Sequence, residues 1–387
     1  MFKKVTKKNP LILPTSVKAI YGFIYSLFWV FVPIFLVKQG FSGYHIGLFI
    51  GIANFMAIIT ALPAGIANDR LRSKKMILYA LIFSALYYVG LLTTTNAIIL
   101  AFAFICGGLG RNLFNVSIDS LAYRTLNRKK MPTQLGKYVG YAVFAEIVGF
   151  MIGGNVINSY GFENTLKVII IMLIITGFAA LFLPITHTFK FKLFEYKKDI
   201  FRKEVLMFIV VVFLFSLHYG AEATSYSLFL KTNFALDIGQ IGIFVGGAII
   251  FLALSVLYYS RKIAKGFDPK YVFYIGLIVS GIGHIIFALQ QDVILAFIAR
   301  SFHEWGDGAM IFSIFYGIVR IFKIERIGGN ASFITFTSIL GTSVSAFIFG
   351  PIGEHFGYHV PLFVTGITTL CSFLLLYYLQ KRTLQKA

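Results

Sequence analysis

Between two long apolar stretches the sequence reads Gly65-Ile-Ala-Asn-Asp69-Arg70-Leu-Arg72-Ser-Lys74-Lys75. The stretches on either side, residues 46–68 and 75–95, are each long enough to cross the roughly 30 Å apolar core of a bilayer as a helix. The segment between them is therefore predicted to be a loop that joins two transmembrane helices. Its four basic side chains indicate a loop that stays on the cytoplasmic side.

The same alternation of apolar stretch and short loop runs along the whole chain. Hydrophobic residues make up 58% of the sequence and charged residues only 13%, which excludes a soluble domain. The connecting segments are too short for a separate catalytic domain, and no GxSxG, HExxH or P-loop pattern is present, so no enzyme and no cofactor are expected. The predicted spans are residues 12–37, 46–68, 75–95, 97–123, 135–158, 165–187, 205–230, 240–260, 270–290, 292–321, 329–352 and 358–379.

The placement of the basic residues gives the orientation of the chain. Of the 35 Lys and Arg residues, 29 fall in the N-terminal tail, the even-numbered loops and the C-terminal tail. By the positive-inside rule, both termini are then cytoplasmic in a multi-pass protein of the cell membrane. The net charge of +20 thus indicates contact with an anionic inner leaflet rather than with nucleic acid.

The two halves of the sequence repeat each other at an offset of about 195 residues. Ile46-Gly-Leu-Phe-Ile-Gly51 corresponds to Ile241-Gly-Ile-Phe-Val-Gly246, and Tyr160-Gly-Phe162 corresponds to Phe356-Gly-Tyr358. The fourth and tenth spans align without a gap, Gly110 on Gly306 and Arg124 on Arg320. We predict an all-α integral membrane protein of twelve transmembrane helices in two pseudo-symmetric six-helix bundles. The predicted domains are residues 1–187 and 205–387, joined by a cytoplasmic linker at 188–204.

The loop between the second and third predicted spans resembles a signature of the major facilitator superfamily, found there between the second and third helices. Gly65, Asp69, Arg70, Lys74 and Lys75 match the pattern, whereas Ser73 and Arg72 depart from it. The resemblance covers the whole chain and implies secondary transport by alternating access, with the substrate site between the halves. It also implies that the loop is a conformational latch, formed by Gly65, Asp69, Arg70, Arg72, Lys74 and Lys75, in which Asp69 accepts hydrogen bonds from a neighbouring helix N-terminus.

The fifth span carries four glycines that resemble a motif of proton-driven exporters in the same superfamily. Gly140, Gly149 and Gly153 fit that motif, but Gly154 stands where the motif has proline. Close helix packing accounts for these four glycines equally well. They are the only feature of the sequence that favours export.

Ionisable residues inside the spans are few and concentrated. Charges at this depth are costly and usually mark a functional site. In the superfamily, the first, fourth, seventh and tenth helices line the central cavity, and most of the deep charges fall on three of these. At 100° per residue each of these three spans presents one polar stripe. The stripes are Arg111, Asn115 and Asp119; His218, Glu222 and Tyr226; and Arg300, His303, Glu304 and Asp307.

These stripes are the predicted proton-coupling and substrate site. The repeat places Arg111 opposite Asp307, so that an ion pair between the halves is expected there. Five deep carboxylates face only two arginines, and some must therefore carry protons at neutral pH. Glu146 and His284 lie off the cavity helices and are expected to serve structural roles, and Lys18 is expected to reach the inner surface.

The sequence therefore predicts a monomeric proton-coupled secondary transporter of a small organic solute, with export favoured. Three alternatives remain open. An importer of sugars or other metabolites uses the same features. A divalent-metal transporter would use His218, Glu222, His303, Glu304 and Asp307 as ligands, although no diagnostic metal-ligand spacing is present. A membrane sensor or accessory protein that does not transport belongs to a different class.

Overall fold

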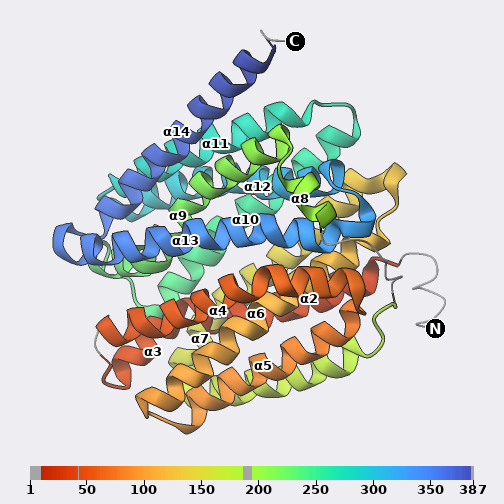
Figure 1. Ribbon diagram of the computed structural model, residues 1–387. Helices are drawn as coiled ribbons and strands as arrows, with labels where there is room; N and C mark the ends of the chain where they lie inside the picture. Colours follow the sequence, from red (N-terminus) through yellow and green to blue (C-terminus); the bar gives the residue numbers. More distant parts are fainter. Residues whose placement is uncertain (1–9, 42, 186–193, 385–387) are drawn as a thin grey trace.

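The computed structural model describes residues 10–41, 43–185 and 194–384, and within these ranges the chain forms helices and no strands. Figure 1 shows the helices running side by side in two groups, one from each half of the chain. The lysines of the N-terminal tail (Lys3, Lys4, Lys7 and Lys8) and residues 186–193 of the predicted linker lie outside the described residues.

Ten described helical stretches are long and apolar enough to cross a membrane. The stretch Arg128–Ala180 contains two spans. A further span, α12, is absent from the ten because charged and polar residues interrupt its middle. The total is the predicted twelve, and their bounds agree with the apolar stretches of the sequence. The helices are α2 (Ile12–Ser26), η1 (Trp29–Phe31) and α3 (Val32–Lys38) in the first span, then α4 (Gly43–Arg70), α5 (Ser73–Thr93), α6 (Ala97–Thr125), α7 (Met131–Ala180), α9 (Lys203–Asn233), α10 (Ile238–Ala264), α11 (Pro269–Ala288), α12 (Val293–Ile321), α13 (Ile327–Phe356) and α14 (His359–Leu384), with short helices η2 (Arg128–Lys130), α8 (Phe194–Ile200) and η3 (Ile324–Arg326).

The repeat seen in the sequence is also present in the backbone. Asn96 caps α6 by accepting from the N–H groups of residues 98 and 99, and Asp292 caps α12 in the same way, 196 positions later. The bend inside α7 falls at Gly161 (φ 78°), and its counterpart Gly357 (φ 96°), again 196 positions later, ends α13. Both glycines have positive φ, which side chains disfavour. The two halves therefore have helix caps and helix breaks at equivalent positions.

Two helix pairs join the halves. Along α7 and α10, glycines allow close backbone approach: a Cβ on Gly154 would meet the Ile238 carbonyl oxygen at 2.7 Å, and one on Gly246 would meet the Ile147 carbonyl oxygen at 3.0 Å. The second pair, α4 and α13, meets at the ends where Gly65 lies against Ser332 and Gly328.

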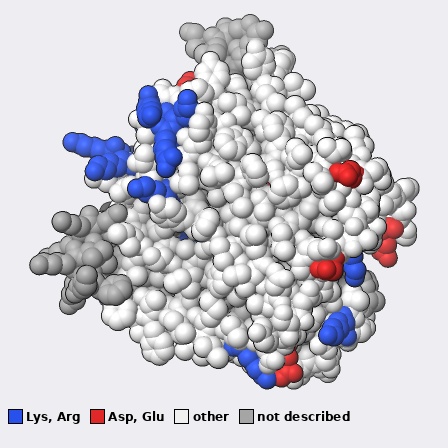
Figure 2. All heavy atoms as spheres, turned by 180° about the vertical axis from the view of Figure 1, so that it is seen from behind, with Lys and Arg blue, Asp and Glu red and all other residues white. Residues whose placement is uncertain are grey.

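Charged side chains are segregated on the surface. Figure 2 shows the largest group of Lys and Arg at one end of the molecule, then a broad band without charge, and most of the visible Asp and Glu toward the other end together with a few Lys and Arg. An uncharged band of this kind suits contact with lipid. We call the end that carries the even-numbered loops the basic side.

Gly161 offers a direct test of the bend in α7. We expect Gly161→Ala to lower the unfolding free energy by about 1–3 kcal/mol, because the residue must keep a backbone conformation that is nearly restricted to glycine. Space is no obstacle, since a Cβ there would meet nothing within 4 Å. Gly177, also with no atom within 4 Å of a Cβ but in helical conformation, supplies the control. Thermal unfolding in detergent should show a clear loss for Gly161→Ala and none for Gly177→Ala; equal stabilities would contradict the bend.

Candidate functional site

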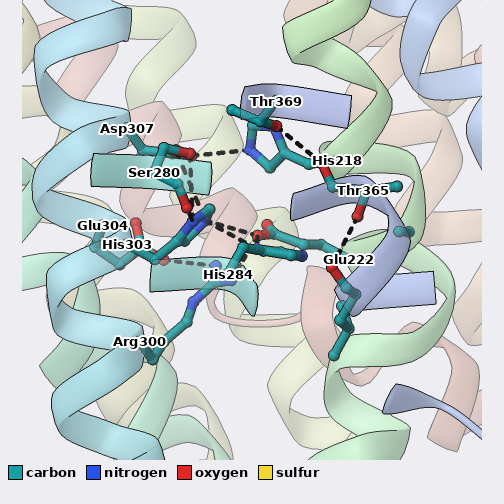
Figure 3. A network of polar contacts seen from close by, with 12 residues as sticks. His218, Glu222, Ser280, His284, Arg300, His303, Glu304, Asp307, Thr365 and Thr369 are labelled. Atoms are coloured by element: carbon teal, nitrogen blue, oxygen red, sulfur yellow. Dashed lines mark hydrogen bonds and ion pairs between the residues drawn. The ribbon is translucent and has the colours of Figure 1, made fainter. Parts of the chain in front are cut away.

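A buried polar network in the second half joins side chains from α9, α11 and α12 (Figure 3). At its centre Arg300 donates from Nη1 to Glu222 Oε1 (2.5 Å) and from Nη2 to Glu304 Oε1 (2.6 Å). Its guanidinium also lies over the Tyr226 ring, 4.2 Å from the centroid. One cation therefore compensates two carboxylates, and the network brings together the predicted residues of the second and third stripes.

Two histidines extend the network and share one geometry. His218 Nδ1 donates to the Phe215 carbonyl oxygen (2.5 Å), while its Nε2 lies 3.0 Å from Asp307 Oδ2. His303 Nδ1 donates to the Ser280 carbonyl oxygen (2.8 Å), while its Nε2 lies 3.1 Å from Glu222 Oε1. Both ring nitrogens of each histidine therefore face an acceptor oxygen.

This geometry fixes a proton count. A neutral imidazole has one N–H, and in each ring that proton is used on a backbone carbonyl. The contact from Nε2 to the carboxylate then needs a second proton, held by either partner. Arg300 against three carboxyl groups leaves two negative charges, and two shared protons neutralise them. A buried network without net charge is the stable form in a medium of low dielectric constant.

The α11 helix contributes residues that the sequence did not assign to the site. Ser280 Oγ donates to Asp307 Oδ1 (2.6 Å), and His284 Nδ1 lies 3.5 Å from Glu222 Oε1 and 3.4 Å from His303 Nε2. His284 was predicted to serve a structural role because α11 is not a cavity helix. The signal that could have corrected this is the spacing of Ser280 and His284, which places two polar side chains on one face of an apolar helix.

Ligand atoms of His218, Glu222 and His303 lie within 4.8 Å of one another, close enough to surround a cation. Each of these side chains already has a hydrogen-bond partner, and Arg300 places a positive charge beside them. In this arrangement the three side chains are therefore already engaged with one another's neighbours in the network.

In the first half, Asp119 of the first stripe has two partners. Lys18 of α2 donates to Asp119 Oδ1 (2.5 Å), and so does the Tyr138 hydroxyl of α7 (2.5 Å). The expectation that Lys18 reaches the inner surface was therefore wrong, because a carboxylate lies within reach on the facing helix. This ion pair ties α2, α6 and α7 together near the basic side.

The rest of the first stripe is less constrained. Arg111 is exposed, and its guanidinium lies 4.3 Å from the Tyr25 ring centroid and 5.0 Å from that of Trp29. Asn115, one turn further along α6, is half-buried. The predicted ion pair between Arg111 and Asp307 does not form, because Asp307 binds His218 and Ser280 instead.

The halves meet on the basic side through Asp69. Its carboxylate accepts from the backbone N–H groups of Gly328 (2.9 Å) and Gly329 (2.7 Å), at the start of α13 in the other half. It also accepts from the Tyr196 hydroxyl of α8 (2.7 Å) and pairs with Arg124 of α6. Asp69 thus caps a helix of the opposite half, in the geometry predicted from the sequence.

The other predicted latch residues surround this contact. A Cβ on Gly65 would meet Ser332 Oγ at 1.9 Å, so that only glycine allows α4 and α13 to lie this close. Lys74 donates to the Leu181 carbonyl oxygen, whereas Arg70, Arg72 and Lys75 are exposed. The cation on Asp69 is Arg124 of α6, which the sequence pattern did not connect with the latch.

The linker helix α8 reinforces the same contact. Asp199 accepts from Arg326 Nε (2.8 Å) and from Asn330 Nδ2 (2.9 Å), and Arg326 also pairs with Glu195. Burial raises the pKa of Asp199, but the hydrogen bonds from Arg326 and Asn330 outweigh it and leave that pKa below its usual value. The carboxylate therefore stays ionised at neutral pH, and its contribution is lost only as the pH falls through the lowered pKa.

The four glycines of the fifth span divide between two neighbours. Gly149 and Gly153 lie against α2, where a Cβ would meet the carbonyl oxygens of Phe23 (2.6 Å) and Leu27 (2.4 Å). Gly140 and Gly154 lie against α10. All four therefore allow close helix packing.

Comparison with known families gives the same fold. A sequence profile of the Major Facilitator Superfamily matches residues 16–230 and again 208–387. The chain belongs to the major facilitator superfamily. Membership makes it a multi-pass membrane protein of a family of secondary transporters, with the twelve-helix, two-bundle fold described above. No curated protein matches the chain in a sequence search.

Solved structures of the superfamily resemble the chain over almost its full length. They include the human organic anion transporter MFSD10 (TETRAN), at 13% identity with a TM-score of 0.78. The transporter FucP in its outward conformation is 12% identical with a TM-score of 0.72, and a variant of the E. coli fucose:proton symporter FucP is 12% identical with a TM-score of 0.73. Each comparison covers 95% of this chain and 98% of the other. At these identities the likeness shows the fold alone.

The central position of Arg300 predicts a large loss of stability on its removal. We expect Arg300→Gln to cost about 3–5 kcal/mol, because two buried carboxylates lose their cation. Adding Glu304→Gln should restore part of the loss. Arg320→Gln, on the same helix but exposed, is the control and should change stability by less than about 0.5 kcal/mol. Thermal unfolding of the purified variants measures this, and equal effects at positions 300 and 320 would contradict the network.

The contact at Gly65 predicts that a single methyl group opens the basic side. Gly65→Ala should push α4 away from Ser332 and expose Ala331, which is 8% exposed and lies in a core cluster shared by both halves. A cysteine at position 331, with Cys106 and Cys371 replaced by serine, should then react faster with a maleimide added from the basic side. Gly51→Ala, on the same helix with nothing within 4 Å of a Cβ, should leave the rate unchanged.

Proposed function

We propose that this protein is a proton-coupled secondary transporter of a small organic solute that works by alternating access. The observation that carries the proposal is the buried network of Arg300, three carboxyl groups and two doubly engaged histidines. It is neutral only with two shared protons, and it lies on helices that line the cavity in this superfamily. Loss of a proton leaves an uncompensated charge in the membrane interior, which biases the protein toward another conformation.

The contact at Asp69 supports a second conformational element. One carboxylate from α4 holds the start of α13 and the linker helix α8, so the basic side is closed in this state. Breaking those hydrogen bonds would release α4 from α13 and let one half rock against the other. We therefore propose that the latch and the network stabilise different states of one cycle.

We propose that the basic side is cytoplasmic and that the protein acts in the cell membrane as a monomer, on the basis of its charge asymmetry. Domains of 1–187 and 205–387 with the linker at 188–204 fit the two-bundle fold. Export is the proposed direction, supported by the glycines of the fifth span. Import of a sugar or another metabolite is the alternative; the structural relatives include a fucose:proton symporter as well as an organic anion transporter.

A divalent cation is a second candidate cargo, because ligand atoms of three side chains converge at His218, Glu222 and His303. The distinction is measurable. If Mn²⁺ or Zn²⁺ raises the melting temperature of the purified protein and Glu222→Gln abolishes that rise, a divalent metal ion replaces the organic solute as the proposed substrate.

The proton count predicts how two substitutions act. Asp307→Asn and Glu222→Gln each remove one shared proton site, so solute-driven proton movement should fall to background while solute exchange without a gradient persists. The measurement uses proteoliposomes with a trapped pH dye, challenged with panels of sugars, amino acids, organic anions and drugs.

Glu163→Gln is the matched control for those variants. Glu163 is an exposed carboxylate that pairs with Lys167, and its loss should leave coupling intact. Unchanged proton movement in Asp307→Asn and Glu222→Gln would overturn the coupling. Solute binding by the wild-type protein without any flux would instead indicate a sensor that does not transport.

A further inference from the structure

Each half of the molecule holds one arginine over a tyrosine ring, on a corresponding pair of helices. In the second half, Arg300 of α12 lies 4.2 Å from the ring centroid of Tyr226 on α9. In the first half, Arg111 of α6 lies 4.3 Å from the ring centroid of Tyr25 on α2. In the repeat, α6 corresponds to α12 and α2 to α9, so the two stacked arginines lie on corresponding helices. Arg111 aligns with Asp307 and therefore lies seven residues, roughly 10 Å, further along its helix than Arg300 does.

The two arginines differ in their counter-ions. Arg300 has Glu222 and Glu304 within 2.6 Å. Among the residues that the structure describes, none places a carboxylate within 4.0 Å of Arg111. Every other deep cation on the cavity helices is paired, Lys18 with Asp119 included. An arginine at this depth normally has a partner or faces a cavity, and stacking alone does not neutralise its charge.

The surroundings of Arg111 fit a binding surface rather than a packed core. Arg111 is exposed, and the half-buried Asn115 amide has no hydrogen-bond partner in the described part of the chain. The buried Tyr25 hydroxyl also lacks a partner. The first span breaks at this level, where α2 ends at Ser26 and η1 begins at Trp29. Interrupted helices near mid-membrane are tolerated where they line a cavity, and in transporters they mark substrate sites.

We propose that Arg111 binds the anionic group of the transported solute, an organic anion whose apolar body contacts Tyr25 and Trp29. This inference rests on the proposed transport function and names its substrate class. A planar guanidinium supplies paired N–H donors that match a carboxylate, sulfonate or phosphate. The aromatic rings already orient the guanidinium, and Asn115 adds a neutral donor and acceptor one turn away.

Glu146 is the internal group that could compete for this role. It is half-buried on α7, within electrostatic range of Lys18 and Arg111, but it makes no ion pair with either. Its side chain lies against Gly22 instead. The proposal therefore expects that Glu146→Gln leaves anion binding intact or tightens it.

Trp29 provides an optical test, because its ring lies 5.0 Å from the Arg111 guanidinium and the chain has only two tryptophans. In a Trp305→Phe background, Trp29 is the only reporter. The anion iodide should quench Trp29 more strongly when Arg111 is present than in Arg111→Gln. The neutral quencher acrylamide should show a smaller difference between the two proteins. Benzoate should change its emission, whereas the neutral isostere benzamide should bind at least about tenfold more weakly, as expected when a charged hydrogen bond is lost.

Variants of the same background decide the outcome. Arg111→Gln should lower the affinity for benzoate at least about tenfold. Arg111→Lys should retain part of that affinity, because lysine keeps the positive charge but lacks the paired N–H donors of the guanidinium. Lys38→Gln is the matched control: Lys38 also lies over an aromatic ring, that of Phe162 at 5.6 Å, but at the surface. It should bind benzoate like the parent.

Three results would each overturn the proposal in protein of unchanged melting temperature. The first is that Arg111→Gln binds benzoate and is quenched by iodide to the same extent as the parent. This includes the case in which the parent shows neither benzoate binding nor iodide quenching. Another is equal affinity for benzamide and benzoate. The third is a loss in Glu146→Gln as large as that in Arg111→Gln. Binding is measured without a pH gradient, so failure of proton coupling in Asp307→Asn would leave these results unchanged and is distinguishable.

Discussion

The need to neutralise charge away from water is the constraint on which this structure depends. Arg300 meets it by bridging Glu222 and Glu304, which draws α9 and α12 together around one guanidinium. His218 and His303 meet it only with protons shared with Asp307 and Glu222. We propose that the requirement for a neutral membrane interior in this way makes the conformation of the protein depend on proton binding. By the same requirement, the exposed Arg111 is unusual, because no carboxylate among the described residues neutralises it.

Much of the fold followed from the sequence because its causes are local. Apolar length predicts each span, and the distribution of Lys and Arg predicts the side on which each loop lies. Gly161 and Gly357 could be matched as repeat positions, and the backbone gives the reason: both adopt positive φ at equivalent bends. Asp69 was likewise expected to accept hydrogen bonds from a neighbouring helix N-terminus, because the N–H groups at the start of a helix favour a carboxylate.

What the sequence could not provide was pairing across helices. The choice of Lys18 for Asp119, Arg124 for Asp69 and His218 for Asp307 depends on helix rotation and depth, which spacing within one span does not determine. His284 and Ser280 were undervalued because cavity lining was assigned by helix number. The structure shows that α11 packs against α12 and contributes Ser280 and His284 to the network, so a helix outside the lining can complete its hydrogen bonds.

The contact at Asp69 has no counterpart in the other half, where Ala264 stands at the corresponding place in the loop after α10. The two helix pairs that join the halves, α4–α13 and α7–α10, therefore differ in how they are held together. The α4–α13 contact is held at one end by the hydrogen bonds and the ion pair of Asp69, which can break and form again. Along the α7–α10 contact, glycines let the two backbones lie close together, and no such hydrogen-bonded carboxylate is present among its described residues. We propose that a molecule built in this way opens by separation of α4 from α13, while the contact between α7 and α10 stays closed and acts as the hinge.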